Sequence, residues 1–166
     1  ANLDGDSRPD MVLMAYDNPS EANSFRYKVG WNLNSNGVAE RWDNGYVEVE
    51  GVGWEGQGAG IAIVNLDEHS RPEMILMAYD NPSEANSFRY KVGWNLNNNG
   101  VANRWDNSYV EVGGVGWEGA GAGVAIANLD DLTRPEMVLM AYDNPSEANT
   151  FRYKVLRNLN DNGVAT

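Results

Sequence analysis

Oxygen-bearing side chains occupy alternate positions near the start of the chain, in the stretch NLDGDSRPDM. Asn2, Asp4 and Asp6 are followed by Asp10, and carboxylate and amide oxygens at this spacing can surround a hard cation. Calcium suits such a loop because it accepts about six to eight oxygen ligands in a loose geometry. The spacing therefore predicts a calcium site in this first loop.

The same frame returns as NLDEHSRPEM and as NLDDLTRPEM, with the acidic pattern reduced each time. The second copy keeps oxygen-bearing side chains at three positions, Asn65, Asp67 and Glu73. His69 replaces Asp6 there and offers a nitrogen that calcium accepts poorly, while the third copy has Leu132, which cannot bind. Asn and Asp also shape tight turns without metal, by accepting bonds from nearby backbone N–H groups. We expect this turn-forming role in the second and third copies, with His69 as an exposed loop residue.

The loops belong to a longer sequence repeat. Residues 1–63 match residues 64–126 at about 50 of roughly 63 positions, and a partial third copy covers residues 127–166. The chain therefore holds about 2.6 copies of one unit.

Short patterns within a unit predict β-strands and no helix. GAGIAIV and MILMAY are apolar runs between glycine and proline, which favours buried strands. SFRYKVGW and YVEVGG alternate between two kinds of residue, as strands with two different faces do. The connections are rich in Asn, Asp, Gly, Pro and Ser, which form turns. We expect an all-β chain with four antiparallel strands per unit. The first unit lacks its first strand at the start and carries the next unit's first strand at its end.

The aromatic residues of the third predicted strand alternate along the chain, as Phe25, Tyr27 and Trp31 do in the first unit. We expect them to form core between adjacent units rather than a platform for a ligand. Trp42 and Trp105, which follow the Asn-rich loops, are expected to cover the base of each unit.

The segments GAG, IAIVNLD, a D-x-D-like loop and RPDMVLMA follow one another, and together they resemble the FG-GAP/VCBS repeat family over essentially the whole chain. That family forms β-propellers, among them the heads of integrin α subunits, secreted bacterial repeat proteins and fungal lectins. The resemblance implies β-propeller-like tandem blades of four antiparallel strands and an extracellular or cell-surface location. It also implies that the first loop binds calcium through the side chains of Asn2, Asp4, Asp6 and Asp10 and the backbone carbonyl of Arg8.

Two further loops of each unit carry side chains suited to a sugar. GVGWEG places a tryptophan and a glutamate between units, and YDNPSEAN joins the second strand to the third. In a propeller these loops lie on one face, where a stacking ring beside carboxylates and amides can form a glycan site. The predicted ligand-binding residues are Asp17, Asn18, Glu21, Trp54, Glu55, Asp80, Asn81, Glu84, Trp117 and Glu118. The alternative is that each tryptophan packs under its own loop and that the acidic loop is a solvated turn.

Composition disfavours several classes of partner and activity. The formal net charge of −12 opposes binding to nucleic acid and anionic membranes, because both carry the same sign of charge. No apolar run approaches the roughly 18 residues of a membrane-spanning helix, and there is no cysteine for a disulfide or a zinc-thiolate site. The single histidine is not repeated, and neither a catalytic triad nor a phosphate loop is recognisable. We expect no enzyme and no catalytic residues.

Repeated copies of one surface favour multivalent binding. We expect a non-enzymatic extracellular adhesive module for glycan or protein partners, and the alternative is a structural building block of an extracellular filament or surface fibre. A propeller closes with about four to eight blades, and this chain supplies fewer. Three arrangements are open: a piece of a longer closed propeller, a protomer that completes a ring with other copies, or one length of an open head-to-tail assembly. We expect self-association through open strand edges or continuation in a longer chain.

Overall fold

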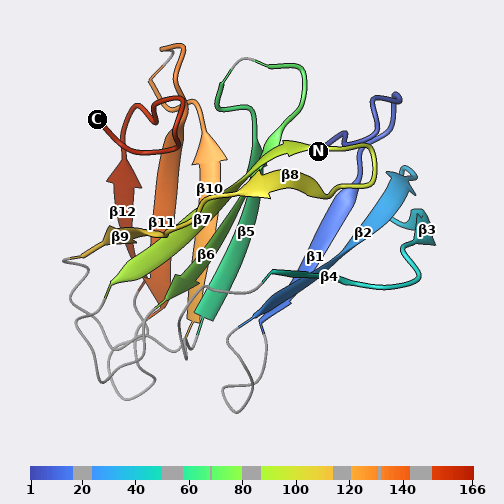
Figure 1. Cartoon of the computed structure of the whole chain (residues 1–166), viewed down its shortest axis with the longest axis horizontal. Helices are drawn as coiled ribbons and strands as arrows, with labels where there is room; N and C mark the ends of the chain where they lie inside the picture. The colour runs from blue at the N-terminus through green and yellow to red at the C-terminus, as the bar shows by residue number, and fades with distance from the viewer. Residues whose placement is uncertain are drawn as a thin grey trace.

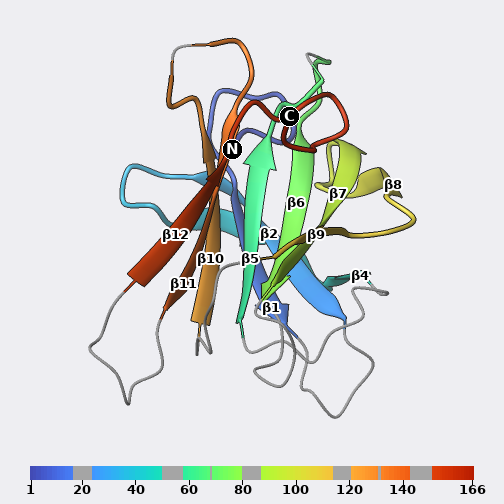
Figure 2. The same ribbon diagram turned by 90° about the vertical axis from the view of Figure 1, so that its left-hand side faces the viewer.

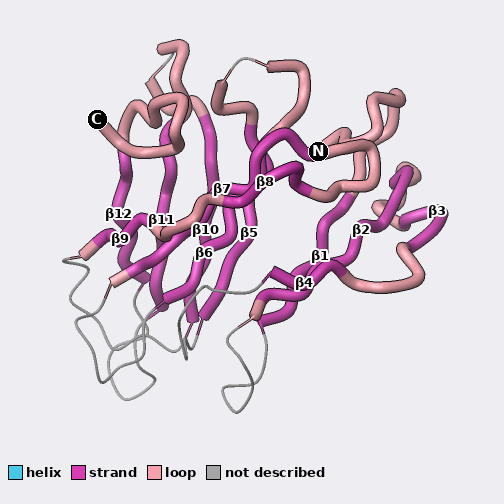
Figure 3. The backbone as a smooth tube through the Cα atoms, in the orientation of Figure 1, coloured by secondary structure: helices cyan, strands magenta, loops and turns pink. Residues whose placement is uncertain are grey.

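The computed structural model (Figures 1 and 2) describes residues 1–16, 24–49, 58–67, 69–79, 87–113, 121–130, 132–142 and 151–166. Within these segments every regular element is a β-strand, and all strand pairing is antiparallel (Figure 3). The predicted all-β class is therefore confirmed. None of the described segments is a helix of the length and apolarity needed to span a membrane.

The described strands form three sheets. The first sheet contains β1 (Met11–Tyr16), β2 (Phe25–Leu33), β3 (Ala39–Trp42) and β4 (Val47–Val49). The second contains β5 (Gly58–Val64), β6 (Glu73–Tyr79), β7 (Phe88–Leu96), β8 (Ala102–Trp105) and β9 (Val110–Val112). The third contains β10 (Gly121–Ala127), β11 (Glu136–Tyr142) and β12 (Phe151–Leu156). The second sheet lies between the other two (Figure 1), because it shares one buried cluster with the first sheet and another with the third.

The prediction of four strands per unit is wrong for the second sheet, which has five. β8 and β9 both pair with β7, at opposite ends of it. Two short strands therefore lie along the edge of β7 where one strand was predicted. The residues of β8 were expected in a connection. The break between the two strands is explained by Asp106, whose carboxylate accepts bonds from the backbone N–H of Val92 at 3.2 Å and from Nε1 of Trp94 at 2.7 Å. The side chain of Asp106 takes the place of a backbone partner for β7, so the regular pairing between β7 and β8 ends at this point.

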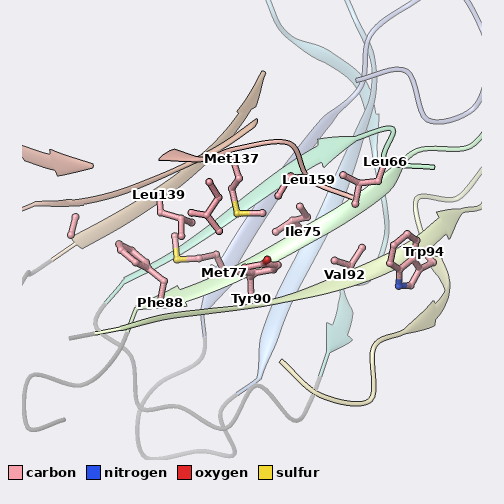
Figure 4. Packing of buried hydrophobic residues seen from close by; sticks show 12 residues of the cluster. Leu66, Ile75, Met77, Phe88, Tyr90, Val92, Trp94, Met137, Leu139 and Leu159 are labelled. Carbon is pink, nitrogen blue, oxygen red and sulfur yellow. The ribbon is translucent and has the colours of Figure 1, made fainter. Parts of the chain in front are cut away.

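Successive sheets pack face against face. We call front face the side of each sheet that carries Tyr27, Tyr90 or Tyr153, and rear face the opposite side. The front face of the first sheet packs on the rear face of the second in one buried cluster, and the front face of the second packs on the rear face of the third in another. Figure 4 shows the second cluster, in which Tyr90 and Met77 of the second sheet lie opposite Met137 and Leu139 of the third.

Small residues allow the inner strands β5 and β10 to come close. A Cβ atom added to Gly58 would lie 2.6 Å from the backbone nitrogen of Ala122, and one added to Gly60 would lie 2.9 Å from Cγ1 of Val124. Real Cβ atoms do not approach other atoms so closely, so this contact requires glycine at both positions.

Candidate functional site

The first Asn/Asp-rich loop is shaped by its own side chains. Oδ1 of Asn2 accepts a hydrogen bond from the backbone N–H of Gly5 at 2.8 Å. Oδ1 of Asp4 accepts one from Asp6 at 3.1 Å, and Oδ1 of Asp6 accepts one from Arg8 at 2.7 Å. These are successive side-chain-to-backbone turns, in which short polar side chains replace the partners that a strand would supply.

Asp10 closes the loop from a buried position. Its Oδ2 accepts a hydrogen bond from the backbone N–H of Leu3 at 2.7 Å, and its Oδ1 accepts one from Asn32 at 3.0 Å. Asn32 lies at the end of β2 with a φ of 57°, a left-handed conformation that asparagine tolerates better than most residues. The carboxylate of Asp10 therefore joins the start of the loop to the far end of a strand.

The other two loops repeat this arrangement with glutamate. Glu73 accepts bonds from the backbone N–H groups of Leu66 at 2.8 Å and Asn95 at 3.4 Å. Glu136 accepts them from Leu129 at 2.7 Å and Asn158 at 3.4 Å. We call Asp10, Glu73 and Glu136 the anchor acids. All three are buried, and each holds a loop and a strand end together by charge-assisted hydrogen bonds.

Burial raises the pKa of Glu73 above its ordinary value of 4.5. The hydrogen bonds from the backbone N–H groups of Leu66 and Asn95 oppose this rise in pKa, while the negative charge of Asp67 adds to it. The carboxyl group of Glu73 therefore holds its proton more tightly in the folded chain than an exposed glutamate does.

The second and third loops also show the expected turns. Oδ1 of Asp67 accepts a bond from the backbone N–H of His69 at 3.1 Å, and Oδ1 of Asp130 accepts one from Leu132 at 3.1 Å. His69 is exposed, as predicted, and its Nδ1 lies 2.9 Å from Oδ1 of Asp67. Asn65 bonds the backbone carbonyl of His69 through its side-chain amide.

Several of the oxygen atoms predicted to bind calcium in the first loop already accept hydrogen bonds. Both carboxylate oxygens of Asp10 bind backbone N–H groups. The turns use one carboxylate oxygen each of Asp4 and Asp6. Across the described segments, no three acidic, histidine or cysteine side chains are grouped so as to hold a metal. Calcium binding by the first loop stays a prediction.

The ten predicted ligand-binding residues lie outside the described residues: Asp17, Asn18, Glu21, Trp54, Glu55, Asp80, Asn81, Glu84, Trp117 and Glu118. The strand ends that flank their loops are described. In the second sheet, Tyr79 precedes one such loop and Gly58 follows the other, and these two residues are paired. Phe88, which follows the first loop, pairs with both Tyr79 and Val112. Both loops of the unit therefore begin or end at the same end of the sheet.

The first sheet has the same arrangement at this end. Phe25 pairs with Tyr16 on one side and with Val49 on the other. Tyr16 precedes one predicted ligand loop, and Val49 comes shortly before the other. Equivalent loops thus leave equivalent sheet ends in the two units.

The aromatic ladder is core, as predicted. Trp31 and Trp94 are buried, and Nε1 of Trp31 donates to Oδ1 of Asp43 at 2.8 Å. The guanidinium carbon of Arg41, the residue paired with Trp31 across the sheet, lies 4.7 Å from the ring centre of Trp31 in a cation–π contact. The role of Asp43 was not predicted, although its position directly after a tryptophan in both units could have indicated it.

A hollow of about 550 Å³ lies mainly on the rear face of the first sheet and was not predicted from the sequence. It is lined by Leu13, Met14, Ala15, Arg26, Tyr27, Lys28, Trp42 and Tyr46. The ring of Trp42 covers Gly30, where an added Cβ atom would lie 2.8 Å from the indole. The wall is mostly apolar, with two cationic side chains, and it offers shape and hydrophobic contact rather than a catalytic group.

Comparison of the chain with protein-family models, with curated proteins and with solved structures gave no match.

Proposed function

We propose that this chain is a non-enzymatic binding module of β-propeller-like units that acts outside the cell or at its surface and binds a glycan or a protein through equivalent loops. One observation supports this most strongly. The strands that flank the two predicted ligand loops converge on one end of the sheet, and the first and second sheets share this register. The sequences of these two loops supply tryptophan, carboxylate and amide side chains, the groups that recognise a sugar.

The repeated packing of the sheets adds a second argument. Each unit is joined to the next by the same contacts, so the strand ends that flank its predicted ligand loops recur in an equivalent arrangement. Weak sites in such an array gain affinity together when the ligand is itself repetitive. A polysaccharide or a clustered glycoprotein fits this display better than a small isolated ligand.

A glycan array probed with the labelled chain tests the proposal. We expect binding to densely printed glycans, and at least about 10-fold weaker binding by the double variant Trp54→Ala/Trp117→Ala, because a stacking ring is lost from each loop. The matched control is Leu132→Ala, which removes an exposed apolar side chain away from the predicted ligand loops. An array without signal contradicts glycan binding, and equal loss in the double variant and the control contradicts the assignment to these loops.

A further inference from the structure

The contact between successive sheets occurs twice with the same atoms. The hydroxyl of Tyr27 donates to the carbonyl oxygen of Gly100 at 3.0 Å, and that of Tyr90 donates to Gly163 at 2.8 Å. Each glycine also lies against the valine two residues after the tyrosine, since a Cβ atom added to Gly100 or Gly163 would lie 2.7 or 2.9 Å from Cγ2 of that valine. One interface is thus built twice within the chain.

The front face of the third sheet has the same interface residues as the front faces of the other two sheets, but here these residues are exposed. Tyr153 is 71% exposed, Phe151 62% and Leu129 52%, whereas their equivalents in the first two sheets are buried. The strand pairing is unchanged, because Met140 pairs with Tyr153 as Met77 pairs with Tyr90. These side chains are therefore presented on a regular sheet, at the side of the molecule that faces the viewer in Figure 2.

The first sheet carries, uncovered, the part of the rear half that β6, β7 and β8 supply in the second sheet, and its described strands include no counterpart of β5. Leu13 is 53% exposed, whereas its equivalents Leu76 and Leu139 are fully buried at 0%. Leu13 and Trp42 line the hollow described above, and Trp105, the equivalent of Trp42, packs in the cluster between the first and second sheets. The hollow is the place that a front face fills in the other two sheets.

The turn around Gly37 in the first unit has the same conformation as the turns around Gly100 and Gly163, which take part in the internal interface. Gly37 donates to the carbonyl of Asn34 at 2.9 Å, and the same bond measures 2.8 Å at Gly100 and 2.7 Å at Gly163. Gly37 is exposed where the other two glycines are buried, and a Cβ atom added to it would meet nothing within 4 Å. A partner would find this loop preformed, which lowers the entropy lost on binding.

We propose that the front face of the third sheet in one copy of this chain binds the rear face of the first sheet in a second copy, by the interface that the chain uses internally. Tyr153 of one copy donates its hydroxyl to the carbonyl of Gly37 of the other. Leu129 lies against Gly37, as Leu3 and Leu66 lie against Gly100 and Gly163, and Phe151 covers Leu13. The positive charge of Lys28 in the hollow does not prevent this, because its equivalent Lys91 is buried in the second sheet. Faces, rather than strand edges, carry the association.

The association is head to tail. Each copy has one front half and one rear half, so a pair of copies keeps one free half of each kind and can add further copies until the assembly closes or extends. The inference does not rest on the proposed function, because the predicted ligand loops could bind with or without it.

Sedimentation velocity on the chain over a series of concentrations tests this inference. We expect concentration-dependent association by the unmodified chain and about 100-fold weaker association by Leu13→Lys or by Tyr153→Lys, since each places an ammonium group in one half of an apolar interface. An equimolar mixture of the two variants should form a dimer and nothing larger, because each supplies the half that the other lacks. The matched control Leu132→Lys changes a leucine of equal exposure, 55%, outside both faces and should associate normally.

A more conservative variant distinguishes weaker association from misfolding. Tyr153→Phe keeps the ring and loses the hydroxyl, so we expect about 10-fold weaker association with an unchanged melting temperature in dilute solution. A chain that is monomeric up to about 1 mM overturns the proposal. So does a mixture of the two lysine variants that stays monomeric, or a control variant that is impaired as strongly as they are.

Discussion

The hydroxyl of Tyr27 donates a 3.0 Å hydrogen bond to the carbonyl oxygen of Gly100, 73 residues further along the chain. Both groups are buried between the first and second sheets. Burial, with a smaller effect from the charge of Asp43, raises the pKa of Tyr27 to about 12. The neutral hydroxyl is thus kept as a donor, and it ties a strand of one sheet to the loop of the next.

Replacement of this tyrosine tests the internal interface. We expect Tyr27→Phe to lower the free energy of unfolding by about 1–3 kcal/mol, because it leaves the buried carbonyl of Gly100 without its donor. Urea unfolding followed by tryptophan fluorescence measures the change. Tyr153→Phe, measured where the chain is monomeric, should change the free energy by less than about 0.5 kcal/mol because its ring is exposed. Equal effects of the two variants would count against the distinction between covered and open faces.

Glycine in the inner strand gives a second matched pair. Gly60→Ala should lower the free energy of unfolding by about 1–3 kcal/mol, because its methyl group would meet the side chain and backbone of Val124. Gly123 holds the same place in the next unit, and its added Cβ atom would lie 3.6 Å from the nearest atom, Cε of Met140. Gly123→Ala should be neutral or slightly stabilising, by up to about 1 kcal/mol. Thermal and urea unfolding of both variants would show whether β5 and β10 approach as closely as described.

The anchor acid of the second loop predicts a pH dependence. The folded pKa of Glu73 is raised, so the folded chain binds this proton more tightly than the unfolded chain. Its contribution to stability is therefore fully present below the unfolded pKa of about 4.5 and is lost as pH rises through the folded pKa. Glu73→Gln has no such titration. We expect the free energy of unfolding of the wild type, relative to that of Glu73→Gln, to fall over the pH range above about 4.5. A difference that is constant over this range would refute the raised pKa.

Calcium binding by the first loop is tested with Asp6→Ala. In chelator we expect a loss of about 0.5–1 kcal/mol, because an exposed turn bond to Arg8 is removed. Added calcium should raise the melting temperature of the wild type and not that of the variant, since a ligand of the folded state stabilises by mass action. Asp130→Ala removes a turn bond of the same kind, from the backbone N–H of Leu132 in the third loop, and should keep the response to calcium. If calcium does not raise the melting temperature of the wild type, the loop forms turns only.

The sequence by itself determined the longer strands and the loop turns of this protein, but not the short strand β8. Alternation and apolar runs located β2, β6 and β7, and Asn and Asp at the loop positions indicated the side-chain-to-backbone turns that the structure contains. These features are local, because a strand pattern or an Asx turn depends on residues close together in the chain. The pairing register of β1 with β2 is the same as that of β6 with β7, because the two pairs have nearly the same local sequence.

Tertiary structure decided which of the repeated residues are covered. Tyr90 and Tyr153 lie in the same segment FRYKV, pair with equivalent methionines, and are 0% and 71% exposed. Only the presence of a neighbouring sheet distinguishes them, and burial depends on that neighbour rather than on the residue's own sequence context. The same holds for Asp10, whose spacing indicates a cation ligand and whose buried contacts make it an anchor for two backbone N–H groups.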